Sequence, residues 1–475
     1  MALGLKRGIV ELADYDPEGK TLATGAIEHL WRIFGSAAKD IQHVGSTAIK
    51  GIKAKPIIDI AVAVEDFAEV ELLMPQLNEA GFFKSKLHAI ENDMLLCDDD
   101  EKADTRSYHI HIVKVHSTQW KNYLNFRDYL NAIPDVAKEY ERLKVNLATK
   151  HPSDRNAYTD GKDNMVARLL SEAQTWVMLH DIPEFDSFIR IKPITKGMSG
   201  DKKYFVETAD NNRFLLRIAD ISEHDRKKAE YEIMQKAASL NIPMSQPVDF
   251  GVCNGEKNVY TLLTWIDGEE LESILPALSE KEQYSLGIKS GEILYKIHKV
   301  TAPQDVEDWS IRYFKVIDER LDAFCAEGIP FDDDTYILDF LEANRHLLKG
   351  RPQCRHHGDY HEGNMILSAG NTLSIIDWHT VDFENYGDPW IELARYSGSP
   401  SFTSGQINGY FENKPPKDFW VLFAYYLAAS AITSIVWAKY FAPERLGSIL
   451  QLNKDVLLWF DNMQNPVPSW YLKGN

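Results

Sequence analysis

The 475-residue sequence predicts an α+β protein of two domains that meet near residue 180, and three observations predict it. First, the length exceeds what one core usually organises, since domains average roughly 100 to 200 residues. Second, 44% hydrophobic and 26% charged residues indicate a folded chain and exclude disordered or collagenous classes. Third, the helical pattern ending in VARLLSEAQTW (166–176) stops before Pro183, and the strand-like FIRIKPITKG follows. We therefore expect domains at 1–180 and 181–475.

The first domain alternates strand and helix patterns. The segments IIDIAVAV (57–64) and HIHIV (109–113) are typical of strands, and EVELLMPQLNEAGF (69–82) between them has helical spacing. Further helical segments follow up to residue 176. An α/β arrangement is expected here.

The second domain begins with strands and continues with helices. FVETAD (205–210) and RFLLRIAD (213–220) are strand-like segments joined by a turn, a helix is expected at 222–240, and VDFGVC and NVYTLLTWI are further strands. After Leu271 the pattern is mainly helical. A small β-rich lobe followed by a larger helical lobe fits a two-lobed kinase.

Charge and composition limit the kinds of binding partner and the cellular compartment that we expect for this protein. Most of the net charge of −19 lies in residues 181–475, which argues against nucleic acid and is compatible with steering a cationic small molecule. Four cysteines without CxxC spacing and a charged N-terminus predict a cytoplasmic protein in a reducing compartment. The uncharged run from Phe419 to Ala438 is long enough to span a bilayer, but its Tyr, Ser and Thr residues favour a buried helix, so no membrane partner is expected. The oligomeric state is left open.

The segment HGDYHEGN (357–364) concentrates groups that handle charge. A hairpin, MILSAGNTLSII, separates Asn364 from Asp377, so these two side chains are expected side by side as oxygen ligands of Mg²⁺. Asp359 is then expected to point at a substrate. Phosphoryl transfer needs such a metal and a base that orients the incoming hydroxyl.

Two further segments complete a phosphate site. In KGMSGDKKYFVET (196–208), Gly197, Ser199 and Gly200 form a turn where backbone N–H groups can approach phosphate. Arg217 stands on a strand where kinases place a phosphate-binding Lys, and Glu230 or Glu232 on the next helix is expected to hold it.

Residues 185 to about 450 resemble the aminoglycoside phosphotransferase and choline kinase-like superfamily through HGDYHEGN, IIDWH and GDPWIELAR. The resemblance implies Asp359 as catalytic base, Asn364 and Asp377 as Mg²⁺ ligands, and Arg217 with Glu230 as a clamp on ATP or GTP. It implies an adenine-binding hinge at Thr264, Trp265 and Ile266. His357 is expected to orient the loop through a backbone hydrogen bond, and Asp388 to stabilise it. Arg217 and Glu392 depart from the Lys and Asp common in the family.

The first domain has its own candidate site. HVGSTAIKGIKAKPIIDIAV (43–62) joins a Gly-Ser turn to a strand bearing Asp59, so Ser46 and Lys55 are expected to bind phosphate oxygens and Asp59 a metal. With SYHIHIV and AYTDGKDNMVARLLSEAQTW, residues 5–176 resemble the GrpB family, which is similar to nucleotidyltransferases. Active nucleotidyltransferases carry two carboxylates two residues apart, but position 61 is Ala, which favours binding without turnover.

The sequence leaves two interpretations undecided in this domain. His111 either completes a metal site with Asp59 or is one of two structural histidines on an alternating strand. Four basic residues either form an anion-binding site or are only surface charge. They are Lys55, Arg127, Lys144 and Lys162.

Together these features predict an ATP- or GTP- and Mg²⁺-dependent O-phosphotransferase that acts on a hydroxyl of a small, cationic, aminoglycoside-like molecule. The alternatives are a housekeeping kinase for choline, an amino acid or an amino sugar, and a nucleotide-sensing protein whose GrpB half does no chemistry.

Overall fold

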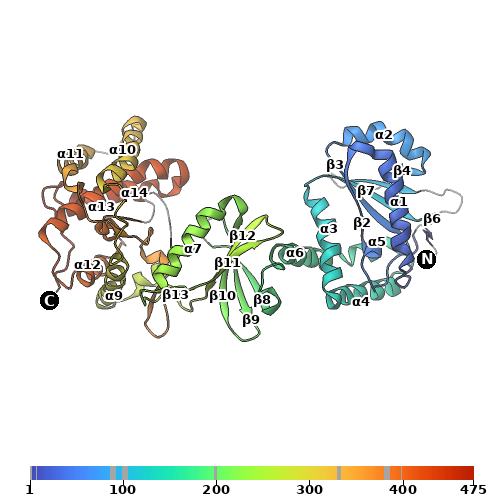
Figure 1. Ribbon diagram of the computed structural model, residues 1–475, viewed down its shortest axis with the longest axis horizontal. Helices are drawn as coiled ribbons and strands as arrows, with labels where there is room; N and C mark the ends of the chain where they lie inside the picture. The colour runs from blue at the N-terminus through green and yellow to red at the C-terminus, as the bar shows by residue number, and fades with distance from the viewer. Residues whose placement is uncertain are drawn as a thin grey trace. The chain divides into compact units, whose positions relative to one another are not determined.

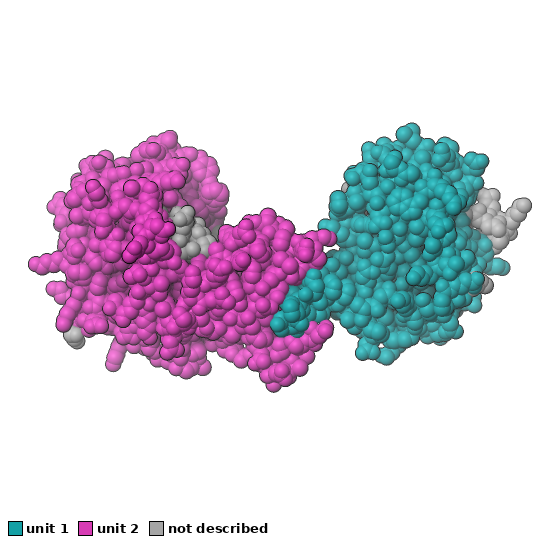
Figure 2. Space-filling model, in the orientation of Figure 1, with its two compact units in different colours: residues 1–185 teal, residues 186–475 magenta. Residues whose placement is uncertain are grey.

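The computed structural model describes residues 3–6, 8–85, 93–98, 105–196, 200–328, 333–378, 386–396 and 398–474. It divides into two compact units, residues 1–185 and 186–475 (Figure 2). Residue 180, where the sequence predicts the boundary, is the C-cap of helix α6 (Asp163–Leu179). The α+β two-domain fold predicted from the sequence is confirmed.

Unit 1 is built on a five-stranded mixed sheet (Figure 1). Its strand order is β2 (Ala38–Val44), β3 (Ile58–Val64), β7 (Tyr108–Lys114), β5 (Asp93–Asp98) and β4 (Phe82–Lys84). Strands β3 and β7 run parallel and the other neighbours run antiparallel. A separate pair joins β1 (Leu5–Lys6) to β6 (Thr105–Arg106).

The two faces of this sheet have different roles because successive strand residues point to opposite sides. Ile58, Ile60 and Val62 pack under α1 (Glu18–Phe34) and α2 (Phe67–Glu79) in an apolar core. Asp59 and its neighbours on the opposite face lie toward α3 (Thr118–Ala132), where Trp120 packs on Ala61 and Ala63. The remaining helices are α4 (Pro134–Lys150), α5 (Arg155–Asp160) and α6. The one polar side chain of β3, that of Asp59, therefore lies on the face opposite this core.

Unit 2 begins with a five-stranded antiparallel sheet and helix α7 (His224–Ala238). The strand order is β11 (Pro247–Cys253), β12 (Asn258–Thr264), β10 (Arg213–Asp220), β9 (Lys202–Thr208) and β8 (Phe188–Ile194). Within this sheet Arg217 pairs with Lys203 on one side and Thr261 on the other. The β-rich lobe expected from the sequence is present.

The rest of unit 2 is mainly helical. Its helices are α8 (Leu271–Ile274), α9 (Glu280–His298), α10 (Trp309–Glu327), α11 (Asp334–Asn344), α12 (Pro400–Tyr410), α13 (Lys417–Phe441) and α14 (Leu446–Trp459). Its short strands are β13 (Glu269–Glu270), β14 (Cys354–Arg355), β15 (Met365–Leu367), β16 (Leu373–Ile375) and β17 (Tyr386–Gly387). Strands β15 and β16 form the predicted hairpin.

Helix α13 is the one helix in the described parts of the chain that is long and apolar enough to cross a membrane, by length and composition only. In this fold, 78% of its most apolar 18-residue window is buried. Phe419, Phe423 and Ile432 belong to the main core of the helical lobe. The segment packs as the buried helix that its composition favours.

Helices α9 and α12 touch backbone to backbone. A Cβ atom added at any of the four facing glycines would lie 2.1 to 2.2 Å from a carbonyl oxygen of the other helix. These glycines are Gly287, Gly291, Gly405 and Gly409. Any larger residue would force the two helices apart, because such contacts are far inside van der Waals distance.

Candidate active site and family

The loop that begins at His357 is anchored by buried groups. His357 is fully buried, and its Nε2 lies 3.1 Å from the Ile376 carbonyl oxygen, which is the loop-orienting bond expected for this residue. The Glu392 carboxylate accepts hydrogen bonds from the backbone N–H groups of His357 (3.0 Å) and Gly358 (2.8 Å). Glu392 also pairs with His298 at 3.0 Å. The Glu found where the family often has Asp therefore holds the loop.

Asp388 stabilises the segment that leads into the same loop. Its buried carboxylate accepts two hydrogen bonds from Arg351, at 2.5 and 3.1 Å, and one from the Tyr426 hydroxyl at 2.9 Å. Its carbonyl oxygen lies 3.0 Å from His356 Nε2. Asp388 thus braces the loop, in line with the role expected for it.

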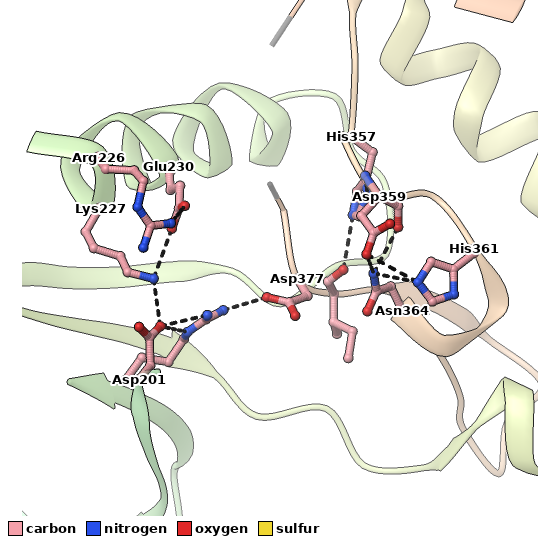
Figure 3. A network of polar contacts seen from close by, with 11 residues as sticks. Asp201, Arg226, Lys227, Glu230, His357, Asp359, His361, Asn364 and Asp377 are labelled. Atoms are coloured by element: carbon pink, nitrogen blue, oxygen red, sulfur yellow. Dashed lines mark hydrogen bonds and ion pairs between the residues drawn. The ribbon is translucent and has the colours of Figure 1, made fainter. Parts of the chain in front are cut away.

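Asp359 lies at the centre of the site. Its Oδ2 accepts a hydrogen bond from the Asn364 amide at 3.0 Å and lies 3.3 Å from His361 Nε2, as Figure 3 shows. Its Oδ1 accepts a hydrogen bond from Arg395 at 2.7 Å. Burial raises the pKa of Asp359, but the bond from His361 and the charge of Arg395 outweigh it and hold the pKa well below its ordinary value. The carboxyl group therefore stays ionised.

The hairpin brings Asn364 and Asp377 to the same end. Ile376 donates its backbone N–H to the Asn364 carbonyl at 3.0 Å, so the two chain segments are adjacent at this point. Asn364 donates from its amide nitrogen to Asp359, and its Oδ1 atom accepts no hydrogen bond within the described residues. Asp377 has a φ of 60°, which is uncommon for a residue other than glycine. The chain segments that carry the two expected metal ligands are therefore adjacent, and their role as ligands stays a prediction.

A network of charges fills the β-rich side of the site (Figure 3). Arg217 donates to Asp201 at 2.8 and 3.0 Å and to Asp377 at 2.6 Å. Lys227 donates to the same Asp201 oxygen at 2.7 Å and lies 3.4 Å from Glu230. Arg217, Lys227 and Asp377 also line a small pocket in this unit.

The expected direct clamp between Arg217 and Glu230 is wrong for this structure. Glu230 instead accepts from Arg226 at 2.6 Å and pairs with Lys227, both on its own helix. Asp201 takes the place of Glu230 because it lies in the turn ahead of β9, between Arg217 and Lys227. Arg217 and Glu230 are therefore connected only through Asp201 and Lys227.

The expected glycine-rich turn is only partly visible. Gly197 and Ser199 lie outside the described residues, whereas Gly200 is exposed next to Asp201. The carboxylate of Asp201 is nearly buried, with 5% of its side chain exposed. An acidic side chain thus sits at the base of the turn that was expected to receive phosphate.

The segment expected to be the adenine-binding hinge, Thr264 to Ile266, uses several of its backbone hydrogen-bonding groups within the fold. The Thr264 N–H donates to the Gln246 carbonyl at 2.9 Å, and its carbonyl accepts from the Ser245 hydroxyl at 2.6 Å. The Trp265 N–H donates to the Arg213 carbonyl at 2.9 Å. Among the described residues, the Trp265 carbonyl and the Ile266 N–H have no hydrogen-bond partner. These two groups, rather than Thr264, are available to an adenine ring.

A cavity of about 670 Å³ opens in the helical lobe next to the loop. Helices α10 and α13 supply most of its walls, including Tyr313, Trp437 and Phe441. Arg395 lines the cavity and also binds Asp359, so the cavity reaches the catalytic loop. Sequence reasoning missed Arg395, Asp201 and Lys227, because no local pattern marks them.

In unit 1 the structure brings some of the candidate residues together and gives others separate structural contacts. Asp59 lies beside His109 and His111, and Ser46 starts a short helical turn after Gly45. Lys55 is half-buried against the Tyr158 ring. Two of the four candidate anion-binding cations are engaged in structure: Arg127 donates to the His43 carbonyl, and Lys144 donates to the Lys53 carbonyl at 2.6 Å.

Comparison with known proteins assigns each half. Residues 9–172 match the GrpB protein family, and residues 190–419 match the phosphotransferase enzyme family. The glutamate-rich protein GrpB of Alkalihalophilus pseudofirmus is 41% identical over 172 residues, which cover 36% of this chain and 99% of that protein.

Solved structures similar to this chain include two kinases. A thermostable mutant of aminoglycoside phosphotransferase APH(4)-Ia with ADP and hygromycin B is 15% identical, covers 60% of this chain and 98% of its own, and has a TM-score of 0.44. A choline/ethanolamine kinase family protein from Mesorhizobium loti is 14% identical, covers 62% and 97%, and has a TM-score of 0.44. The chain therefore belongs to the GrpB family, and its residues 190–419 form a second region that matches the phosphotransferase enzyme family.

Proposed function

We propose that unit 2 transfers the γ-phosphoryl group of ATP to a hydroxyl of a small molecule with the help of Mg²⁺. The observation that carries this proposal is the convergence of Asp359, Asn364 and Asp377 at one end of the β15–β16 hairpin. A carboxylate that orients a hydroxyl, next to two oxygen donors for a metal, is the arrangement that phosphoryl transfer requires. Membership of the phosphotransferase family supports the same reaction.

The donor set fits magnesium. Asp377 contributes a carboxylate with 30% of its side chain exposed, and Asn364 contributes an amide oxygen. Mg²⁺ prefers one or two such protein oxygens together with substrate phosphates. When bound, the ion supplies neutralising charge on the phosphate oxygens. Asn364 and Asp377 are therefore the residues that would hold it.

The residues of the chain supply positioning. Asp359, ionised between Arg395 and His361, orients the acceptor hydroxyl toward the phosphate. Arg217 and Lys227 are cations at the inner end of the proposed nucleotide site, and both pair with Asp201. Phosphate oxygens compete with this carboxylate for the same N–H groups, so nucleotide binding exchanges one anionic partner for another.

The 670 Å³ cavity is the proposed acceptor site, because Arg395 joins its wall to Asp359. Its lining is aromatic and aliphatic with few charges. Among its described lining residues, Glu319 is acidic, whereas Arg320 and Arg395 are basic. A molecule with several amino groups would gain little from that balance, whereas a ring or alkyl portion would bury well against the aromatic walls. A hydroxylated metabolite with an apolar face, of the amino-alcohol type, suits this cavity.

An aminoglycoside acceptor is the second candidate. The acidity of residues 181–475, with a net charge of −19 for the whole chain, favours attraction of cations toward this unit. Aromatic rings also bind a cationic group through their faces, at about 0.5–2 kcal/mol per contact. The two acceptor classes differ in charge, so a direct comparison separates them.

The test measures phosphate transfer by the full chain with ATP and Mg²⁺. Acceptors are a panel of amino alcohols and aminoglycosides, and GTP replaces ATP in parallel reactions. Coupled release of nucleoside diphosphate and a mass gain of one phosphate on the acceptor report transfer. A gain on an amino alcohol supports the primary proposal, and a gain only on an aminoglycoside supports the second. Nucleotide binding without transfer to any acceptor would contradict both.

A further inference from the structure

Three potential metal ligands converge in unit 1, away from the kinase site. Asp59 on β3 is in register with His109 on the parallel strand β7, and His111 follows two residues later on the same face. Asp59 Oδ1 lies 3.1 Å from His109 Nδ1 and 3.8 Å from His111 Nε2. One ligand atom from each of the three residues falls within 4.8 Å of the other two. We call Asp59, His109 and His111 the metal triad.

The ring of His111 is held in the orientation that a metal ligand needs. Its Nδ1 lies 2.9 Å from the Tyr123 hydroxyl, which in turn donates to Asp93 at 2.9 Å. This leaves Nε2 facing Asp59. Metal-binding histidines typically use their second ring nitrogen in this way, and a carboxylate commonly completes the chain. The support for His111 comes from α3 and β5, so it does not depend on the metal itself.

The donor chemistry indicates a transition metal. A paired Mg²⁺ site would need a second carboxylate two residues after Asp59, but Ala61 stands there and pairs with His111. Imidazole suits Zn²⁺ and related ions better than Mg²⁺, which prefers oxygen ligands. Two histidines and one carboxylate leave a coordination position open, as in catalytic rather than structural zinc sites.

The backbone beside the triad is shaped for close approach. Gly45 has a φ of 70°, and a Cβ atom there would lie 2.3 Å from Asp59 Oδ2. Only glycine therefore lets this turn pass so near the carboxylate. The turn continues into Ser46, as expected for a Gly-Ser phosphate-binding segment.

Positive charges that form no direct ion pair within the described residues lie within electrostatic reach of Asp59. Lys55, Arg155 and Lys162, which we call the cation cluster, are half-buried and form no ion pair within the described parts of unit 1. Lys55 and Lys162 both contact the Tyr158 ring, with Nζ 4.2 and 4.7 Å from its centre. Asp59 attracts both lysines electrostatically.

These cations destabilise one another in the free protein. Burial lowers the pKa of Lys55 to about 7, and repulsion by Lys162 and Arg155 adds to the effect. A half-buried group of like charges is costly unless an anion compensates it. A phosphate group bound by these cations would supply that compensation.

We propose that unit 1 binds one divalent transition metal ion through Asp59, His109 and His111, together with a phosphate-bearing small molecule held by Lys55, Lys162 and Arg155. The site lies wholly within the GrpB domain. It does not depend on the phosphotransferase reaction of unit 2.

To test the metal half of the proposal, bound metal is first removed from the full chain with a chelator. Zn²⁺ binding is then measured by calorimetry and by metal analysis. Asp59→Asn and His111→Ala are expected to weaken Zn²⁺ binding at least tenfold. Asp135→Asn removes an exposed carboxylate at the start of α4 and is expected to leave Zn²⁺ binding unchanged. Thermal melting confirms that each variant folds, and Co²⁺ absorption reports histidine ligation directly. Equal Zn²⁺ affinity in wild type, Asp59→Asn and His111→Ala would overturn the metal site.

The phosphate half is tested with inorganic pyrophosphate as probe, in an Asp377→Asn background with Zn²⁺ present. Lys162→Gln is expected to weaken pyrophosphate binding at least tenfold while Zn²⁺ affinity stays the same. Lys150→Gln, an exposed lysine at the end of α4, is the matched control and is expected to bind like the background. Equal losses in Lys162→Gln and Lys150→Gln, or no binding at all in the background, would overturn the phosphate site.

Discussion

Arg395 Nη1 lies 2.7 Å from Asp359 Oδ1, and the same arginine lines the cavity proposed for the acceptor. One cation therefore connects the proposed base with the wall against which its substrate would pack. The contact is partly exposed, with 47% of the Arg395 side chain accessible, so an acceptor can compete for it. This link between the two regions motivates the first prediction.

Replacing Arg395 by Gln is expected to move the acid limb of kcat/KM to higher pH. Arg395 is one of the groups that hold the pKa of Asp359 low, so its removal raises that pKa and the base protonates earlier as pH falls. The measurement is a pH–rate profile. Arg395→Lys keeps the charge, so its acid limb is expected to stay close to that of the wild type. An acid limb that does not move in Arg395→Gln would rule out the coupling.

Asp359→Ala is expected to lower phosphate transfer by at least about 10²-fold. Nucleotide affinity should stay within about tenfold of wild type, because Asp359 contacts Asn364 and Arg395 but is not itself a proposed metal ligand. Transfer assays and nucleotide calorimetry on the same preparation check both parts. A collapse of nucleotide binding would assign Asp359 to the metal rather than to the acceptor.

Arg217→Ala is expected to raise the KM for ATP about tenfold or more, because a charge-assisted contact to phosphate is lost. Glu230→Gln should change it less than about threefold, since Glu230 contacts Arg226 and Lys227 rather than Arg217. Steady-state kinetics at saturating acceptor compare the two. An equally large effect of both variants would indicate that the Arg217–Glu230 clamp forms during turnover.

Glu392→Gln is expected to destabilise unit 2 by about 1.5–3 kcal/mol, because the buried N–H groups of His357 and Gly358 lose a charged acceptor. Burial raises the pKa of Glu392, but His356 and His298 hold it well below the ordinary value of 4.5. The stabilisation is therefore present above pH 4.5 and is lost as pH falls below it. Thermal melting across pH 3–7 should show a smaller acid loss in the variant, and parallel curves would contradict this.

The central part of the kinase site could be predicted because its geometry is local. Asp359 and Asn364 share one turn, and a two-stranded hairpin returns the chain so that Asp377 lies beside Asn364. Such short connections leave few alternatives. The two-lobed order of elements likewise follows from periodicity, and the structure confirms it.

The ion-pair partners could not be predicted in the same way. Arg217 could meet a carboxylate from several segments, and the choice of Asp201 over Glu230 depends on how α7 packs beside β9. Arg395 is 36 residues from Asp359 in the sequence, so their contact arises only from the tertiary fold. In unit 1, the register of β3 against β7 decided that His109 faces Asp59, which alternation alone left open.

The glycine contact between α9 and α12 has a consequence for how acceptor choice can change over time. Tyr360, in the catalytic loop, is tied to Ser290 on α9, which stands between Gly287 and Gly291. At the four facing glycines the two backbones touch, so the spacing of α9 and α12 is fixed there. The cavity walls come mainly from other helices, α10 and α13. If the cavity is the acceptor site that we propose, substitutions in these walls change which acceptor fits while the reacting groups keep their positions.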